Sequence, residues 1–503
     1  MNSHSFGQKI LRGIWSSLLG QGAVFALSLL LTPWIIKNLG AGGYGVYTLM
    51  WSALSFLSIL NLGSLTAAQC FTAQWHLLND RKPSLAALLR GTLFFMAGAG
   101  IFGGSGLFLM RHFIARHFLH GSSPLLALGP SVFGLLALAI PSYFISQFSL
   151  TVIWGLKRFS LYNALISLQA LLITGGSSLI LFAGFRLKAI AALFIFVESL
   201  LAFVGLWIVS PALSAPSAAI SREDKKDYFS FCAKSAMPLF FVTLLSQGDR
   251  AVIGLWLPLT QLGYYALSAS LAQKFNSIAA SVAATSFPIL SELIGKGEEE
   301  RLRRIYLKSA ELSFFALLPL GIFSFVLIPQ FMTLWLGPAF SGACTWPFRI
   351  LVIANVFNLS VYMPNTIAAG KGFPHWIGYV WMEKALIAIP LWAVLIPRWG
   401  ILGTAIGLLV AEVLVAIPFL MSVHSRTLNL GFIEFFSSSL WRPLTASLGL
   451  AVLGFLFHGA IGSWFGFLGF AVLGALLYAG ISYLLIDSDA KALLIQEITL
   501  KIR

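Results

Sequence analysis

Seven ionisable side chains lie inside long apolar stretches of this sequence. They are three bases and four acids: Glu198, Asp249, Arg250, Lys274, Glu383, Lys384 and Glu412. Each costs about 2.5–3.5 kcal/mol at the centre of a membrane helix, or roughly 20 kcal/mol for seven that face lipid. Most of them must therefore face protein or a hydrated cavity. There, bases attract anions, and acids bind protons or cations.

Polar side chains recur at helical spacing in three of the same stretches. One stripe holds Thr243, Ser246, Gln247 and Arg250; the next holds Ser270, Lys274, Ser277 and Ser281, with Gln273 beside them; the third holds Asn355, Asn358, Tyr362 and Asn365. Steps of three or four residues place side chains on one helix face. The stripes predict a hydrated cavity in the second half of the chain. Simple packing between helices is the alternative, and it suits the serines better than the three asparagines.

The composition requires membrane helices to hold these residues. Of 503 residues, 58% are hydrophobic and 10% are charged, against roughly 25% charged in soluble proteins. A soluble enzyme and a disordered chain are excluded, and the three distant cysteines exclude a disulfide scaffold. Because about 20 apolar residues span a bilayer, we predict an all-α membrane protein with about 14 transmembrane helices. The predicted spans are 14–36, 44–62, 91–110, 129–153, 161–183, 189–210, 236–256, 263–290, 310–336, 345–369, 376–396, 401–423, 443–459 and 464–486.

The basic residues indicate which ends of the spans face the cytoplasm. The chain has 32 Lys and Arg against 17 Asp and Glu, a net charge of +15. With the N-terminus inside, 22 of the 32 fall in cytoplasmic segments, seven fall outside and three fall within spans. Cytoplasmic loops collect Lys and Arg in this way. We therefore predict a multi-pass protein of the cell (inner or plasma) membrane with both termini cytoplasmic, and no nucleic-acid partner.

Weak internal similarity indicates a repeat. Residues 34–49 resemble 254–269, and residues 191–203 resemble 405–417, which aligns Glu198 with Glu412. A shift of six helices preserves orientation, so the two halves are expected to be parallel repeats. The predicted domains are a six-helix bundle at 1–212, a cytoplasmic linker at 213–235, a second six-helix bundle at 236–423, and two further transmembrane helices with a cytoplasmic tail at 424–503.

Motifs for nucleotide or metal chemistry are missing from the sequence. Lys296 and Lys371 each lie between two glycines, but neither has the upstream glycine and following Ser or Thr of a phosphate-binding loop. His112, His117 and His120 share one loop at poor ligand spacing. The outer loops are too short for a catalytic domain. We therefore expect no catalytic residue, no metal, no cofactor and no enzymatic activity.

Several motifs together resemble the polysaccharide transporter, or oligosaccharide flippase, family of the MOP exporter superfamily. The resemblance covers roughly residues 8–423. Its motifs are Leu39-Gly40…Tyr44-Gly45-x-Tyr47, Asn61-Leu62-Gly63, Asp249…Gly254…Leu262-Gly263-Tyr264-Tyr265, Pro288, Leu336-Gly337-Pro338 and Gly400-Ile401-Leu402-Gly403-Thr404-Ala405. Asn61 departs from the family, which usually has an acidic residue there. The resemblance implies a V-shaped MOP/MATE-like fold of two six-helix bundles that work by alternating access.

The resemblance also implies a substrate. The roles of the buried residues follow from their burial and stripe spacing, and only Asp249 lies in a family motif. The substrate would be an undecaprenyl-pyrophosphate-linked oligosaccharide, moved to the outer leaflet for surface polysaccharide (O-antigen, capsule or exopolysaccharide) biosynthesis. Membrane lipids would surround the protein, and a polysaccharide polymerase and glycosyltransferases would be its partners. The residues expected to line the substrate cavity are Arg250, Lys274, Gln273, Gln247, Asn355, Asn358 and Asn365. The acids expected to couple transport to ions or protons are Asp249, Glu198, Glu412 and Glu383.

Three alternatives remain open from the sequence. A lipid II flippase and a cation-coupled multidrug exporter belong to the same superfamily, although cavity bases argue against a substrate that is an organic cation. An integral-membrane glycosyl-transfer enzyme is the alternative from another class.

Overall fold

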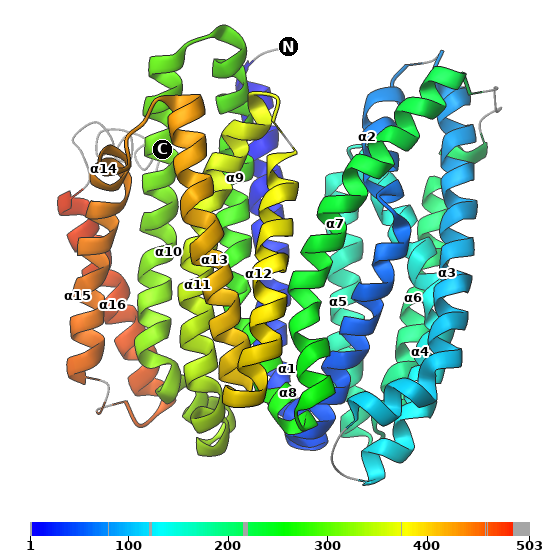
Figure 1. The fold of residues 1–503 in the computed structure, drawn as a ribbon, viewed down its shortest axis with the longest axis horizontal. Coiled ribbons are helices and arrows are strands. Elements are labelled where there is room, and N and C mark those ends of the chain that lie inside the picture. Colours follow the sequence, from blue (N-terminus) through cyan, green and yellow to red (C-terminus); the bar gives the residue numbers. More distant parts are fainter. Residues whose placement is uncertain are drawn as a thin grey trace. The chain divides into compact units, whose positions relative to one another are not determined.

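A computed structural model describes residues 3–78, 80–119, 123–214, 220–373, 375–457, 459 and 461–485, and all regular structure in these ranges is helical (Figure 1). The predicted all-α membrane fold is confirmed. The longer helices are α1 (Ser3–Leu57), α2 (Ser64–Trp75), α3 (Lys82–Phe118), α4 (Ser123–Gly155), α5 (Phe159–Phe182), α6 (Leu187–Ser214), α7 (Arg222–Trp256), α8 (Leu259–Ala272), α9 (Lys274–Lys296), α10 (Glu299–Leu336), α11 (Pro338–Gly370), α12 (Trp376–Trp399), α13 (Ile401–Val423), α15 (Trp441–Phe457) and α16 (Trp464–Leu485). Short turns complete them: η1 (Ser58–Asn61), η2 (His424–Leu428), α14 (Phe432–Phe435) and η3 (Phe436–Leu440).

Within the described ranges, twelve helical segments are long and apolar enough to cross a membrane. The difference from fourteen has two local causes. Helix α1 contains the first two predicted spans, which meet at a kink where Gly40 has φ 71° and ψ 171°; only glycine adopts this backbone conformation readily. The eighth predicted span is divided at Gln273 into α8 and α9.

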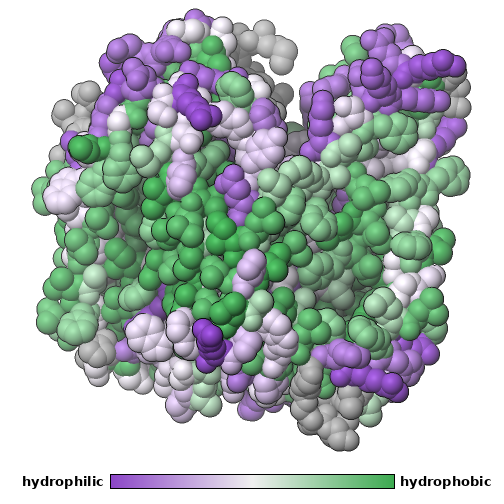
Figure 2. Space-filling model, viewed as in Figure 1, coloured by the Kyte–Doolittle hydropathy of each residue, from purple (hydrophilic) through white to green (hydrophobic). Residues whose placement is uncertain are grey.

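The helices form two compact units, residues 1–263 and 264–503. Helix α7 belongs to the first unit, where it packs against α1, α2 and α3. The division predicted from the sequence follows the repeat instead, with a boundary in the linker at 213–235, and it stays a prediction. On the visible face of each unit, apolar side chains cover the middle and hydrophilic side chains gather towards the ends (Figure 2). This pattern is the one expected for helices that cross a bilayer.

The internal repeat is visible in the helices of the two units. Helices α4 and α11 both have 33 residues, and α5 and α12 both have 24. In the first unit α3 packs on α4 and α4 on α6, and in the second unit α10 packs on α11 and α11 on α13. Equal lengths and equivalent packing partners indicate that α3–α6 and α10–α13 are copies of one four-helix arrangement.

Two sequence motifs have local structural explanations. At the Asn61-Leu62-Gly63 break, the side-chain oxygen of Asn61 accepts the backbone N–H of Gly63 at 2.8 Å, a role that a carboxylate oxygen also fills. The two repeated turns cross each other closely. A Cβ atom on Gly45 would lie 2.3 Å from the carbonyl oxygen of Leu259, and one on Gly263 would lie 2.2 Å from that of Ala41. Both glycines are therefore required by close backbone approach.

The last two helices are held to the second unit by polar contacts as well as packing. The hydroxyl of Tyr478 on α16 donates to the carbonyl of Phe315 on α10 at 2.8 Å. The buried carboxylate of Glu311 on α10 lies 2.7 Å from Lys308 and 3.6 Å from Arg442 at the start of α15. Helices α15 and α16 thus form part of the second unit.

Candidate functional site

Glu198 is held in the first unit by two neutral donors. Its side chain on α6 is 1% exposed. One carboxylate oxygen accepts Gln169 Nε2 on α5 at 2.7 Å, and the other accepts Ser146 Oγ on α4 at 2.7 Å. Within the described residues no base pairs with it. This carboxyl group can therefore take up a proton or a cation without breaking an ion pair.

Glu412 is held in the second unit by a base. Lys384 Nζ on α12 lies 2.7 Å from Glu412 Oε2 on α13, and Lys384 is 0% exposed. The same ammonium donates to Asn358 Oδ1 on α11 at 3.1 Å, and Asn358 Nδ2 lies 3.4 Å from Asn276 Oδ1 on α9. The structure thus links four helices through a single buried chain of polar groups. A buried ion pair of this kind is sensitive to the loss of either partner.

The two buried carboxylates occupy equivalent places in the repeat. Helix α6 begins at Leu187 and α13 begins at Ile401, so the shift of 214 that aligns the helix starts also aligns Glu198 with Glu412. Each acid is contacted from the preceding helix, by Gln169 in the first unit and by Lys384 in the second. The repeat therefore preserves the carboxyl group, while its partner changes from a neutral amide to a cation.

Arg250 lies on α7 with an incomplete set of partners. Its side chain is buried, and Nη1 donates to Gln247 Oε1 at 3.3 Å, an oxygen that also accepts Ser52 Oγ at 3.0 Å. Asp249 is also buried, and its carboxylate accepts the backbone N–H of Arg250 at 2.6 Å. Among the described atoms, the Nε–H of Arg250 is buried and has no acceptor. A buried guanidinium N–H without an acceptor is costly, so it is a natural point for an anion to bind.

The break between α8 and α9 gathers three of the predicted site residues. Gln273 and Lys274 are exposed there. Asn355 on α11 donates to the carbonyl of Ala272 at 3.2 Å, an oxygen at the end of α8, and to the carbonyl of Leu351 at 2.9 Å. The Asn355 amide therefore satisfies a carbonyl near the helix break. The side chains of Ser277 and Ser281 lie outside the described part of the structure.

Glu383 and Lys384 are adjacent in sequence and lie in different environments. Lys384 shares a buried face of α12 with Ala388, Trp392 and Ile396, each four residues further on. Glu383 is exposed. Asn365, the last residue of the predicted α11 stripe, is half-buried. The structure therefore separates Glu383 from the other predicted acids, all of which are buried.

Sequence reasoning did not select three residues that the structure places against the predicted ones. They are Ser146 and Gln169 beside Glu198, and Asn276 beside Asn358. Lys384 was among the seven ionisable residues inside the spans but had no assigned role, and the structure places it against Glu412 and Asn358. For Lys384 a signal was available, because the apolar residues of α12 recur every four positions from it. For Ser146 and Gln169 the sequence signal was weaker, because α4 and α5 each carry several other polar residues.

Potential metal ligands are dispersed in the part of the chain that the structure describes. No group of three or more His, Cys, Asp or Glu side chains gathers there. His117 Nδ1 lies 2.9 Å from the carbonyl of Phe113 in its own helix, and His120 lies outside the described residues.

Comparisons with known proteins give one matching family model and two relatives. A family model described as "Polysaccharide biosynthesis protein" matches residues 92–345. A Shigella flexneri protein named "Putative O-antigen transporter" is 21% identical over 402 residues, which are 79% of this chain and 93% of that protein. The Bacillus subtilis "Uncharacterized membrane protein EpsK" is 26% identical over 331 residues, which are 63% of each chain.

Two solved structures share the fold at low sequence identity. The lipid II flippase MurJ in an inward closed conformation matches with a TM-score of 0.70 at 13% identity, covering 93% of this chain and 98% of that one. An inward-facing multidrug resistance MATE family transporter of the MOP superfamily matches with a TM-score of 0.68 at 14% identity, covering 80% and 94%. Likeness at this level of identity shows the fold alone.

Proposed function

The chain belongs to the polysaccharide biosynthesis protein family, the polysaccharide transporter branch of the MOP superfamily, and from this we propose that it moves a lipid-linked oligosaccharide across the cytoplasmic membrane. The proposed substrate is an undecaprenyl pyrophosphate that carries a short oligosaccharide. Such a unit is made inside the cell and polymerised outside, so it must cross the bilayer. The partners would be the polymerase that uses it and the glycosyltransferases that make it.

The observation that carries this proposal is the buried guanidinium group of Arg250. A pyrophosphate is a multiply charged anion, and guanidinium groups bind such anions with paired hydrogen bonds. Arg250 is buried, and its Nε–H has no acceptor among the described residues. Lys274 is a second basic residue near the polar stripes, and Gln247, Gln273, Asn355, Asn358 and Asn365 offer amides for sugar hydroxyls. A cationic drug would be repelled by these bases.

Buried acids are our proposed coupling sites. Glu198 accepts only neutral donors and can bind a proton or cation directly. Protonation of Glu412 would release Lys384 from its ion pair and free a cation inside the second unit. Asp249 lies next to Arg250 and is buried. Glu383 is exposed, so we give it a smaller role in this proposal. The transport cycle would be alternating access, with both termini in the cytoplasm as the distribution of basic residues predicts.

The proposal is tested by substituting Arg250 in the full-length protein. Arg250→Ala should abolish surface polysaccharide in cells that depend on this protein, while Arg250→Lys should retain part of it because the charge remains. Arg186→Ala is the matched control, since Arg186 is an exposed arginine of the α5–α6 connection. Membrane abundance must be normal in all three variants. Full export by Arg250→Ala would remove the pyrophosphate role.

Two other substrates remain alternatives within the superfamily, namely lipid II and an organic cation. Purified protein in vesicles distinguishes them, because a fluorescent lipid II would be relocated in the first case and an organic cation accumulated in the second. A glycosyl-transfer enzyme would instead make a new product from a lipid-linked sugar donor.

A further inference from the structure

One face of α3 lines two separate grooves in the first unit. The first groove, about 780 Å³, is called here the Lys225 groove, and the second, about 610 Å³, is called the Ser52 groove. The residues of α3 in the Lys225 groove are Ala87, Leu88, Gly91, Thr92 and Phe95, and those in the Ser52 groove are Phe102, Gly103, Gly106, Leu107, Met110, Ile114 and Phe118. These positions recur every three or four residues, so they form one continuous stripe along the helix.

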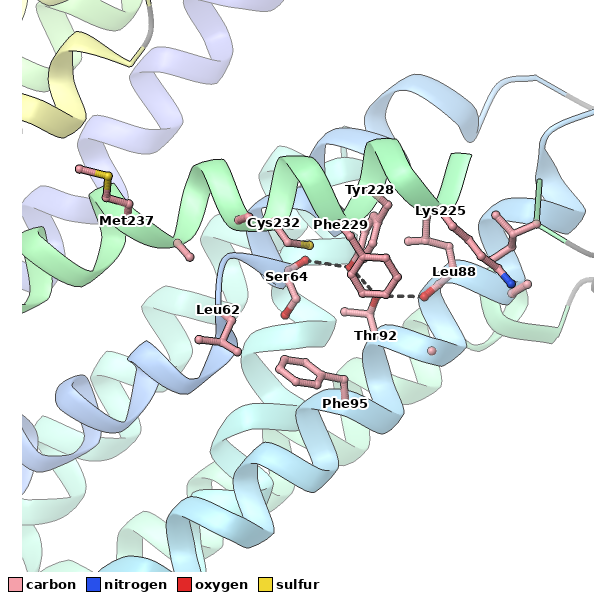
Figure 3. Close-up of a pocket in the computed structure, with 15 residues that line it drawn as sticks. Leu62, Ser64, Leu88, Thr92, Phe95, Lys225, Tyr228, Phe229, Cys232 and Met237 are labelled. Carbon is pink, nitrogen blue, oxygen red and sulfur yellow. Dashed lines mark hydrogen bonds between the residues drawn. The ribbon is translucent and has the colours of Figure 1, made fainter. Parts of the chain in front are cut away.

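The Lys225 groove has an apolar wall and one charge. It lies between α3 and α7, with Lys225 at one end and Met237 at the other (Figure 3). Its few polar groups satisfy one another, because the Tyr228 hydroxyl lies 2.7 Å from Thr92 Oγ1 and 3.3 Å from the carbonyl of Ser64. Lys225 is the one charged residue that lines the groove, and it is exposed. An apolar slot that ends at a single cation suits an anionic lipid head with a long apolar tail.

The Ser52 groove continues the same face of α3 towards its other end. It lies between α1, α3 and α7, and its walls are apolar apart from Ser52. Gly91 and Gly106 lie in the two grooves and are separated by about 22 Å along α3, at about 1.5 Å per residue. The hydrocarbon core of a bilayer is about 30 Å thick, so a span at the predicted residues 91–110 would put one groove in each half of that core. A volume of about 300–1,000 Å³ holds a ligand of drug size, so each groove accommodates a segment of a long chain.

We propose that this face of α3 is the path of the polyprenyl chain of the substrate. The chain would occupy the Lys225 groove, with its phosphate near Lys225, on the cytoplasmic side, and would occupy the Ser52 groove after transfer. The inference rests on the proposed function, because it assumes a lipid-linked anionic cargo. The polyprenyl chain would then lie in grooves on the protein surface and not in bulk lipid. The protein would recognise the substrate by its tail as well as by its head.

Each groove contains a glycine with open space around its Cβ position, where a larger side chain should not disturb the fold. A Cβ atom on Gly91 or on Gly106 would meet no other atom within 4 Å. Gly91→Trp and Gly106→Trp therefore fill the grooves from an exposed helix surface. Gly175→Trp is the matched control, because Gly175 on α5 is equally open and lines neither groove. Lys225→Gln is compared with Lys226→Gln, the neighbouring exposed lysine that lies outside the groove.

The experiment uses the full-length protein in vesicles with undecaprenyl phosphate that carries a diazirine on its tail. Wild-type protein should be photolabelled on α3 and α7 around Gly91 and Ala233. Gly91→Trp should reduce labelling at least fivefold and abolish transport of a lipid-linked oligosaccharide. Gly106→Trp should abolish transport while labelling near Ala233 persists. Lys225→Gln should weaken labelling severalfold, and both controls should behave as wild type.

Three results would overturn this inference. Wild-type transport by both glycine variants would exclude the path along α3. Labelling spread evenly over lipid-facing helices would exclude a specific site. Equal labelling by a diazirine-tagged diacyl phospholipid, without competition from undecaprenyl phosphate, would show that ordinary bilayer lipid fills the grooves. Failure of the wild-type protein to move any lipid-linked oligosaccharide would be a different result, because it would remove the proposed function itself.

Discussion

The ammonium group of Lys384 lies 2.7 Å from a carboxylate oxygen of Glu412, and both side chains are buried in the second unit. The equivalent acid of the first unit, Glu198, receives hydrogen bonds from Gln169 and Ser146 instead. The repeat has therefore kept two buried carboxyl groups and given them opposite electrostatic surroundings. Because of this asymmetry, Glu198 can bind a cation directly, whereas Glu412 holds Lys384 in place.

Removing one member of the buried pair should destabilise the protein strongly. We expect Lys384→Met to lower the free energy of unfolding by about 3–5 kcal/mol, because it leaves the carboxylate of Glu412 buried without a counter-charge. The double variant K384M/E412Q should recover much of this loss. Circular dichroism during unfolding in detergent gives the free energy of unfolding of the wild type, Lys384→Met, Glu412→Gln and the double variant. Additive losses in the double variant would show that the two groups are not coupled.

Glu198→Gln should change the energetics of transport more than the stability of the fold. Gln keeps the shape of the side chain and retains an acceptor for Ser146, but it cannot take up a proton. We expect stimulation of transport by a pH gradient to be lost while membrane abundance stays normal. Glu300→Gln is the matched control, since Glu300 is an exposed acid within a helix and has no proposed role in coupling. An unchanged dependence on the pH gradient in E198Q would remove Glu198 from the coupling site.

The crossing of the two repeated turns should not tolerate a methyl group. Gly45→Ala and Gly263→Ala would each bring a Cβ atom to within about 2.3 Å of a backbone carbonyl oxygen. We expect each to lower the melting temperature and the membrane abundance, because backbone on both sides must move. Gly175→Ala, at an open helical position, should be neutral or stabilising by up to about 1 kcal/mol. Similar melting temperatures for G45A and G175A would contradict the close contact.

The predicted orientation can be tested by labelling cysteines in intact cells. With Cys70, Cys232 and Cys344 replaced by Ser, Lys226→Cys should be protected from a membrane-impermeant maleimide, and Arg186→Cys should react. Both positions are exposed, so access depends on the side of the membrane. The bias of 22 basic residues to seven predicts this result. Labelling of Lys226→Cys but not Arg186→Cys would invert the topology.

Part of the candidate site could be predicted from helical phase and part could not. Glu198 and Glu412 are conspicuous because charged residues are rare inside spans of such low polarity. The distinction between Glu383 and Lys384 requires the phase of α12, which follows from Ala388, Trp392 and Ile396 on the buried face. By contrast, the contact of Glu198 with Gln169 joins residues 29 positions apart. No periodicity within one helix can report which residue of another helix faces it.

The sequence by itself determined the class of the molecule, the approximate positions of its spans and the existence of the repeat. These depend on hydrophobicity summed over about 20 residues and on similarity between distant segments, and both are written along the chain. Only the tertiary structure decided that α7 packs with the first unit, that Lys384 neutralises Glu412, and that one face of α3 lines two grooves. The physical reason is that in lipid a helix satisfies its own backbone, so its partners are chosen by side-chain shape and by a few polar contacts across helices.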